Sequence, residues 1–283
     1  MQPLDRIIGH RGANRLAPEN TMASFRAAHE SGAKSIELDI HKTQDGKLVV
    51  MHDTSVDRTT EGRGEIGDLT SEQVDKLDAG SKFSPQFKGE KVPSLDGVLA
   101  WAKDKVAVDI EIKQPGLEKE LVDLIAAHGA GHRVVVSSFS TPALDGVRAL
   151  NPDLVTGQLL KGTPLKKFAA VGSTVGLALG LGAAALSGVG LVGVALLGIG
   201  GLVAGAWGGR RALQHQIVSE HRDDPAKIIL PHWSLTDRWL TRQLQESGHS
   251  VVPWTADNPK IVNYLLGHCH ADGVITDDPG RFT

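Results

Sequence analysis

The chain has 283 residues, of which 22% are charged and 41% hydrophobic, so it can bury a sizeable core as one large α/β domain or as two smaller ones. Its 30 basic and 33 acidic residues give a net charge of -3 without a basic excess, which argues against nucleic acid as a partner. The single cysteine, Cys269, excludes an intrachain disulfide and is typical of a reducing compartment. The N-terminal residues have no apolar run after a basic start, so no secretory signal is expected.

Outside one apolar segment, short runs rich in β-branched residues alternate with amphipathic helical patterns. The first helical pattern has Asn20 as its expected N-cap and Gly32 as its stop. Strands separated by helices indicate parallel βαβ units. About eight such units predict a (β/α)8 TIM barrel, with a doubly wound open sheet as the alternative. The predicted strands cover residues 6–10, 34–43, 47–53, 106–113, 133–139, 154–160, 227–233, 249–256 and 272–278, and the predicted helices cover 20–31, 94–103, 117–128 and 236–246.

Residues 54–93 interrupt this alternation. They are polar and turn-rich, and they follow the predicted strand that ends in His52 and Asp53. The segment is too long for an ordinary loop, so we expect a lid or a small insertion over the barrel mouth.

Two predicted strands carry acidic side chains at alternate positions. Glu37 and Asp39 are separated by one residue, and Asp109, Glu111 and Lys113 repeat the arrangement, so each set shares one face of its strand. Charges that point into a barrel are costly unless they are paired or bind a metal. Oxygen ligands from Glu37, Asp39 and Glu111 suit one divalent cation, Mg2+ or Ca2+. A salt-bridge cluster around Lys113 explains the alternation equally well.

Two histidines favour the metal-site interpretation. His10 and Arg11 end the first predicted strand, and His52 ends the third. Imidazoles titrate near neutrality and can transfer a proton in either direction. Arg11 and Lys113 are fixed cations that suit a phosphate better than a neutral substrate. These residue types together predict a site that cleaves a phosphodiester.

The motifs that carry this chemistry resemble those of the glycerophosphodiester phosphodiesterase family. They occur in the same order, and the resemblance runs through both ends of the chain and omits only the apolar segment. The matching stretches are GHRGANRLAPENTMASFRAA (9–28), SIELDIHKTQDGKLVVMHD (35–53), DRTTEGRGEIGDLT (57–70), DIEIK (109–113), VPWTADN (252–258) and DGVITDDP (272–279).

The resemblance implies a TIM barrel whose small insertion, residues 54–93, covers the site. It implies hydrolysis of a glycerophosphodiester to sn-glycerol 3-phosphate and an alcohol, with one histidine deprotonating the attacking oxygen and the other protonating the leaving alcohol. By the same resemblance Trp254 is an apolar wall of the substrate pocket, although a core tryptophan is the alternative. The implied metal ligands are Glu37, Asp39 and Glu111, the implied acid–base pair is His10 and His52, and the implied phosphate contacts are Arg11 and Lys113.

The apolar segment, residues 168–209, is 42 residues long and contains no Asp, Glu, Lys, Arg or His. One helix of that length would reach about 63 Å, roughly twice the hydrocarbon thickness of a bilayer. A turn at 187–190 would instead give two helices of membrane-spanning length. Glycines then recur at every fourth position on both halves, which lets the helices pack closely in lipid. We therefore predict a helical hairpin over residues 165–211, inserted after the sixth predicted strand, with barrel segments 1–164 and 212–283 on either side.

Basic pairs flank the hairpin, Lys166-Lys167 before it and Arg210-Arg211 after it, so both ends are expected on the cytoplasmic side of a membrane. A water-soluble helical pair is the alternative, but helices that are apolar all round need cover on every face. The Gly-rich helices could also pair copies of the chain into a homo-oligomer. Because the hairpin follows a strand, it would hold the catalytic face toward the bilayer, which predicts activity on membrane lysophospholipids as well. A catalytically inactive membrane-bound scaffold is the competing hypothesis.

Overall fold

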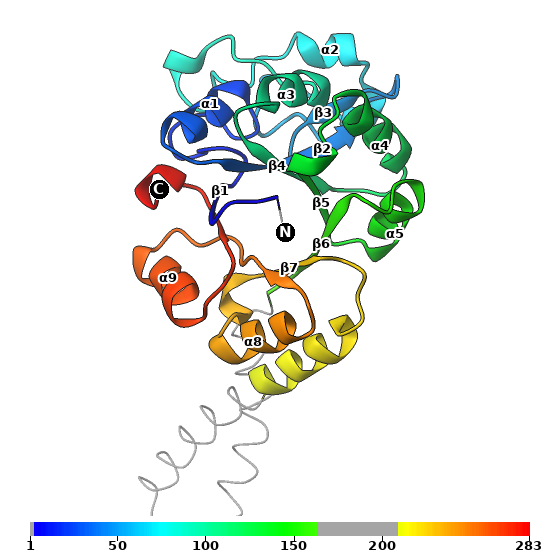
Figure 1. Ribbon diagram of the computed structural model, residues 1–283. Helices are drawn as coiled ribbons and strands as arrows, with labels where there is room; N and C mark the ends of the chain where they lie inside the picture. Colours follow the sequence, from blue (N-terminus) through cyan, green and yellow to red (C-terminus); the bar gives the residue numbers. More distant parts are fainter. Residues whose placement is uncertain (1–2, 163–208) are drawn as a thin grey trace, which may run out of the picture. The chain divides into compact units, whose positions relative to one another are not determined.

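A computed structural model describes residues 3–162 and 209–283. Parallel strands form a barrel in the order β8-β7-β6-β5-β4-β2-β1-β9, with the helices outside them (Figure 1). Backbone hydrogen bonds close the barrel, because Ile275 N donates to Pro253 O and Ala256 N donates to Ile275 O, both at 3.0 Å. The fold is therefore the predicted TIM barrel, and the open doubly wound sheet is wrong. The barrel strands are β1 (Ile7–Gly9), β2 (Ser35–Lys42), β4 (Ala107–Ile112), β5 (Val134–Ser138), β6 (Val155–Leu160), β7 (Ile228–Pro231), β8 (Ser250–Val251) and β9 (Val274–Thr276).

The helices around the barrel begin at side chains that accept hydrogen bonds from the first turn. Ser94 caps α3 and Asp237 caps α8 in this way. The first helix is capped by Thr21 and not by the predicted Asn20. Asn20 instead has a φ of 57° and directs its side chain to Asp39. The helices of the barrel are α1 (Met22–Glu30), α3 (Leu95–Ala102), α4 (Glu118–Ala127), α5 (Thr141–Leu150), α8 (Arg238–Glu246) and α9 (Pro259–Asn263), followed by a π-helical turn over Tyr264–His268.

The strand β3 (Leu48–Val50) is not part of the barrel, which corrects the expectation for residues 47–53. It pairs with β2 in the antiparallel direction, with Ile40 opposite Val50. His52 therefore follows a short hairpin strand that runs back along β2, and Met51 N donates to Asp39 O at 3.0 Å. Because β3 lies off the barrel path, β6 is the sixth strand of the chain but the fifth of the barrel.

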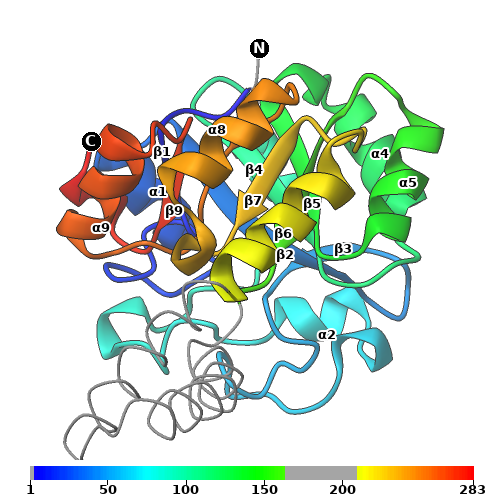
Figure 2. The same cartoon turned by 90° about the horizontal axis from the view of Figure 1, so that it is seen from below.

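Residues 54–93 form a small substructure beside β3. They contain α2 (Ser71–Asp75) and two 3-10 turns, Ile66–Asp68 and Pro85–Phe87. Buried apolar side chains of the segment, among them Val56, Ile66 and Val74, pack together with Val49 and Met51 into a separate core. Figure 2 shows this segment gathered at one end of the barrel.

Alternation along the strands sorts apolar side chains into two cores. Ile36, Leu38 and Ile40 of β2 belong to the larger cluster, which also contains buried side chains of α1, α3 and α4. A smaller cluster lines the barrel interior, with members such as Val135 and Leu230. The intervening positions of β2 and β4 carry the acidic residues, so these side chains point into the barrel.

The chain divides into two compact units, Met1–Leu160 with Pro225–Thr283, and Lys161–Asp224. The second unit contains a helix over residues 209–221. The predicted hairpin over 165–211 falls almost entirely outside the described residues. Within the described ranges, no helix is both long and apolar enough to cross a membrane.

Candidate active site

Three carboxylates meet inside the barrel because β2 and β4 are adjacent and in register, with Asp39 opposite Glu111. Glu37, Asp39 and Glu111 are only 4%, 1% and 8% exposed, and each offers an oxygen within 4.8 Å of the others. Burial and the neighbouring carboxylates raise the pKa of Glu37 well above its ordinary value and that of Glu111 to about 7. Burial also acts on Asp39, but Lys113 and Arg11 lower its pKa below the ordinary value. Ionisation of all three carboxylates at once is therefore unfavourable unless a further cation joins the cluster.

Two cations contact this cluster. Lys113 Nζ lies 2.9 Å from Glu111 Oε1 and 3.2 Å from Asp39 Oδ1. Arg11 Nε lies 3.2 Å from Asp39 Oδ2, and the Arg11 backbone N–H donates to Glu37 Oε2 at 2.8 Å. With all three carboxylates ionised, the two cations would leave one negative charge that a further cation would neutralise. An all-oxygen donor set of this kind fits a hard divalent ion.

His10 follows β1 at the mouth of the barrel. Its Nδ1 lies 2.6 Å from Asp277 Oδ1, just after β9, and its Nε2 lies 4.0 Å from Glu37 Oε2. Burial favours protonation of Asp277, but the hydrogen bond from His10 holds its pKa below the ordinary value. An ionised Asp277 can only accept, so Nδ1 carries the proton and Nε2 faces the carboxylate cluster.

His52 has the same type of partner. Its Nδ1 lies 2.7 Å from Asp53 Oδ1. Burial lowers the pKa of His52 below its ordinary value, and the nearby charge of Asp39 offsets part of this effect. Both predicted histidines therefore lie beside the acidic cluster with Nδ1 held by a carboxylate, which leaves Nε2 available in each ring. Asp53 and Asp277 were not among the residues predicted for the site.

A sequence model of the glycerophosphoryl diester phosphodiesterase family matches residues 10–281. The chain belongs to this family. It is 45% identical over 280 residues to the glycerophosphodiester phosphodiesterase of Caldanaerobacter subterraneus subsp. tengcongensis, a match that covers 96% of this chain and 94% of the relative.

Solved phosphodiesterases have the same fold. The glycerophosphodiester phosphodiesterase of Agrobacterium tumefaciens aligns with a TM-score of 0.70 and 27% identity, over 99% of each chain. An Oleispira antarctica phosphodiesterase in complex with the product sn-glycerol-3-phosphate aligns with a TM-score of 0.69 and 25% identity, over 98% of this chain and 95% of that one. The chain is accordingly an enzyme, a phosphoric diester hydrolase.

Within this phosphodiesterase site, Trp254 lines an inner cavity of about 130 Å³ together with His10, Lys113 and Phe139. Its indole N–H donates to Leu230 O at 2.9 Å, so the polar edge is satisfied and the ring face is left as an apolar surface. The Phe139 ring meets it edge-on at 5.5 Å. The tryptophan thus has core contacts and also borders the site, which combines the two predicted interpretations.

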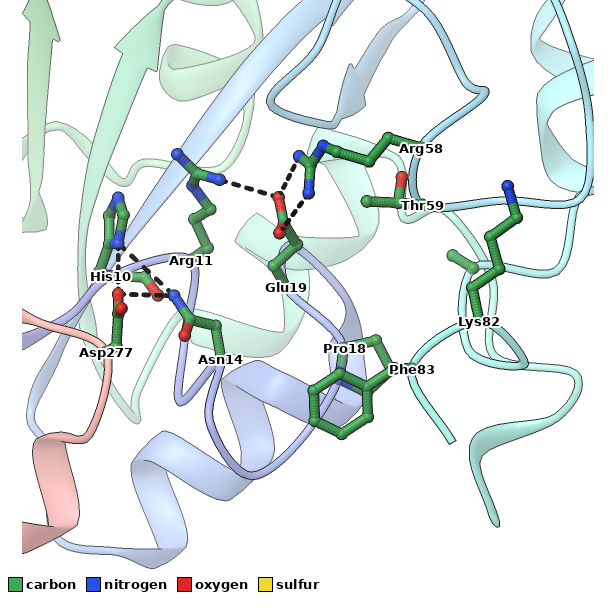
Figure 3. A pocket seen from close by; sticks show the side chains of 11 residues that line it. His10, Arg11, Asn14, Pro18, Glu19, Arg58, Thr59, Lys82, Phe83 and Asp277 are labelled. Atoms are coloured by element: carbon green, nitrogen blue, oxygen red, sulfur yellow. Dashed lines mark hydrogen bonds and ion pairs between the residues drawn. The ribbon is translucent and has the colours of Figure 1, made fainter. Parts of the chain in front are cut away.

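A further group of residues at the mouth was missed by sequence reasoning. Arg58, from the segment 54–93, donates to both oxygens of Glu19 at 2.8 and 2.7 Å. It also donates to Asp53 at 2.6 and 3.1 Å. Glu19 in turn accepts from Arg11 at 2.9 Å (Figure 3). Through Glu19 and Asp53, Arg58 thereby connects the loop that carries Arg11 to His52, which lies just before the segment 54–93. The Arg58–Glu19 contact joins parts of the chain 39 positions apart, and no local pattern signals it.

Proposed function

We propose that the chain hydrolyses glycerophosphodiesters to sn-glycerol 3-phosphate and an alcohol, with His10 and His52 as the acid–base pair. The observation that carries this proposal is the pair of imidazoles held through Nδ1 beside a carboxylate cluster. The 45% identical relative is a glycerophosphodiester phosphodiesterase, and the Oleispira antarctica structure holds sn-glycerol-3-phosphate as product. Both support the same reaction for this chain.

In this mechanism the histidines divide the proton transfers. One Nε2 accepts the proton of the attacking oxygen, from water or from a neighbouring glycerol hydroxyl, and the other imidazole donates a proton to the leaving alcohol. Asp53 and Asp277 hold the two rings in the required orientation. Arg11 and Lys113 bind the phosphate and offset the negative charge that develops on its oxygens.

We also propose that Glu37, Asp39 and Glu111 hold one divalent cation, Mg2+ or Ca2+. Their oxygen donors, and the burial that disfavours their joint ionisation without a further cation, support this assignment. When bound, such a cation supplies Lewis-acid stabilisation of charge on the phosphoryl group. The chain's own contribution is to keep three carboxylates together in a buried site despite their mutual repulsion.

Release of sn-glycerol 3-phosphate from glycerophosphocholine and glycerophosphoethanolamine tests both proposals. Activity should disappear in chelator and return with Mg2+ or Ca2+. Glu37→Gln and Glu111→Gln should each abolish activity and weaken metal binding while the barrel stays folded. Glu72→Gln makes the same change at a side chain of α2 that is 82% exposed, and it should behave as wild type. Near-normal turnover of either cluster variant in chelator would contradict the metal assignment.

A second candidate function is lysophospholipase D-type cleavage of membrane lysophospholipids, and the position of the insert favours it. The segment from residue 161 leaves the barrel after β6, and in a barrel of parallel strands this is the end at which His10 follows β1. We propose that residues 168–209 attach the enzyme to a membrane with its catalytic domain on the cytoplasmic side. The inactive-scaffold hypothesis is disfavoured because every predicted ligand and histidine is retained and assembled.

Comparison of full-length and hairpin-deleted enzyme on lysophosphatidylcholine vesicles and on soluble glycerophosphocholine separates these functions. Deletion should reduce the rate on vesicles selectively. Equal losses on both substrates, or no activity on vesicles, would argue against lysophospholipid cleavage.

A further inference from the structure

Two cavities meet at His10 and Arg11. The inner one contains the carboxylate cluster and Trp254. The outer one, of about 370 Å³, lies between the loop after β1 and the segment 54–93. A phosphodiester carries two substituents on one phosphorus, so a phosphate held at Arg11 directs one substituent toward each cavity. The outer cavity is the larger, and it suits the substituent that varies between substrates, namely the alcohol.

The two carboxylates that line the outer cavity already accept hydrogen bonds from neighbouring side chains. Glu19 accepts hydrogen bonds from Arg11 and Arg58. Asp277 accepts from His10 at 2.6 Å and from Asn14 Nδ2 at 2.7 Å. Neither is left as a free counter-ion for a cationic alcohol such as choline. Among the described residues that line this cavity, Phe83 is the one phenyl or indole ring, whereas quaternary ammonium groups are held by cages of several aromatic faces.

The far side of the cavity instead offers donors. Lys82 Nζ donates to the Asp57 carbonyl oxygen, and an ammonium group has two further N–H bonds to give. The Thr59 hydroxyl makes no hydrogen bond to any described residue, and Thr59 lies between Arg58 and Lys82 in Figure 3. Arg11 and Arg58 are already paired with Glu19, Asp39 and Asp53, whereas no ion pair joins Lys82 to a carboxylate of the described residues, so the far side of the cavity has an unpaired positive charge. Such a surface attracts an anionic group and disfavours a cation.

We propose that the outer cavity binds the alcohol half of the diester, and that Lys82 and Thr59 select alcohols that carry an anionic group, such as a phosphorylated polyol. This inference rests on the proposed diesterase function and adds its substrate class. The phosphate end is held at Arg11 and Lys113, while the anionic group of the alcohol reaches the segment 54–93. This segment would therefore determine specificity without taking part in the chemistry.

The test uses three soluble diesters with the full-length enzyme and saturating divalent cation. Glycerophosphoinositol 4-phosphate and glycerophosphoinositol differ by one phosphate, and glycerophosphocholine supplies the cationic alcohol. Wild type should have a kcat/KM about fivefold higher on the phosphorylated inositol diester than on the unphosphorylated one, which is typical of one partly exposed charge pair. The rate on glycerophosphocholine should be lowest.

Lys82→Gln should remove most of that fivefold preference, mainly through KM, and Thr59→Val should reduce it. Lys91→Gln is the matched control, because Lys91 also donates to a backbone carbonyl of the segment, that of Lys76, but does not line the cavity. A preference that survives Lys82→Gln, or a wild-type preference for glycerophosphocholine, would overturn the inference alone. Failure to hydrolyse any of the three diesters would overturn the proposed function and this inference with it.

Discussion

Replacement of Arg58 tests whether the segment 54–93 positions the catalytic residues. Arg58 is the common partner of Glu19 and Asp53, which in turn hold Arg11 and His52. Hydrogen bonds from Arg58 are the main reason that the pKa of Asp53 lies below its ordinary value. Arg58→Ala should leave both carboxylates ionised, with Glu19 still paired to Arg11 and Asp53 still paired to His52. The side chain that connects the two carboxylates would be absent.

The exposure of the Arg58 side chain and the geometry of its contacts set the expected losses of stability and of kcat. The Arg58 side chain is 48% exposed, so each of its two ion pairs is worth at most about 1 kcal/mol, and the variant should lose about 1–2 kcal/mol of unfolding free energy. Looser placement of His52 and Arg11 should lower kcat by about tenfold, which is about 1.4 kcal/mol of activation free energy. Arg58→Lys keeps the charge but not the forked geometry, so we expect an intermediate rate.

The assay combines glycerol 3-phosphate release with urea denaturation. Arg63→Ala is the control, because Arg63 lies on the same segment but is 90% exposed, and its ion pair with Asp57 is long, at 3.9 Å. It should match wild type in both measurements. If Arg58→Ala loses stability while kcat stays at the wild-type value, Arg58 is only structural and the positioning argument fails.

Three further predictions concern catalysis, pH and location. His10→Ala and His52→Ala should each lower turnover by about 10² or more, and a loss of tenfold or less at both would indicate structural roles. Burial raises the pKa of Asp109 and of Glu111 to about 7, so the folded metal-free protein keeps protons that the unfolded chain releases between about pH 4 and 7. In chelator, the melting temperature should therefore fall as pH rises through this window, and it should fall less for Glu111→Gln; an equal fall in the variant would contradict the assignment. Full-length protein should pellet with membranes and resist salt extraction, whereas a chain that joins Thr163 to Leu213 through a short linker should be soluble and active; full-length protein that remains soluble and monomeric without detergent would exclude the hairpin.

The acidic centre could be predicted because it depends on one short-range rule. Alternate residues of a strand share a face, so Glu37 and Asp39 had to point the same way, as did Asp109 and Glu111. The rule does not give the pairing of β2 with β4, but two acidic strands in one barrel leave few other arrangements. Most of the site could therefore be predicted from the alternation of side chains along the strands and from the family motifs.

The features that the sequence did not predict depend on the direction of a strand or on contacts between residues that are far apart in the chain. A short β-branched run looks the same in a parallel barrel and in an antiparallel hairpin, so the sequence alone places residues 47–53 in the barrel. Asp45-Gly46, between β2 and β3, is a hairpin signal, and Gly46 has a φ of 79°. The Arg58 contacts had no comparable signal, because turns of the segment 54–93 follow no period.

The contact between His10 and Asp277 spans 267 positions of sequence. It forms across the seam where β1 meets β9, the first and last strands of the barrel. The carboxylates of β2 and β4 come from adjacent strands in the first half of the chain, whereas the carboxylate partner of His10 is supplied only when β9 has been made and has docked. The proposed proton transfer at His10 therefore depends on the last strand of the barrel, and a chain that stops before β9 would lack the carboxylate that holds His10 Nδ1.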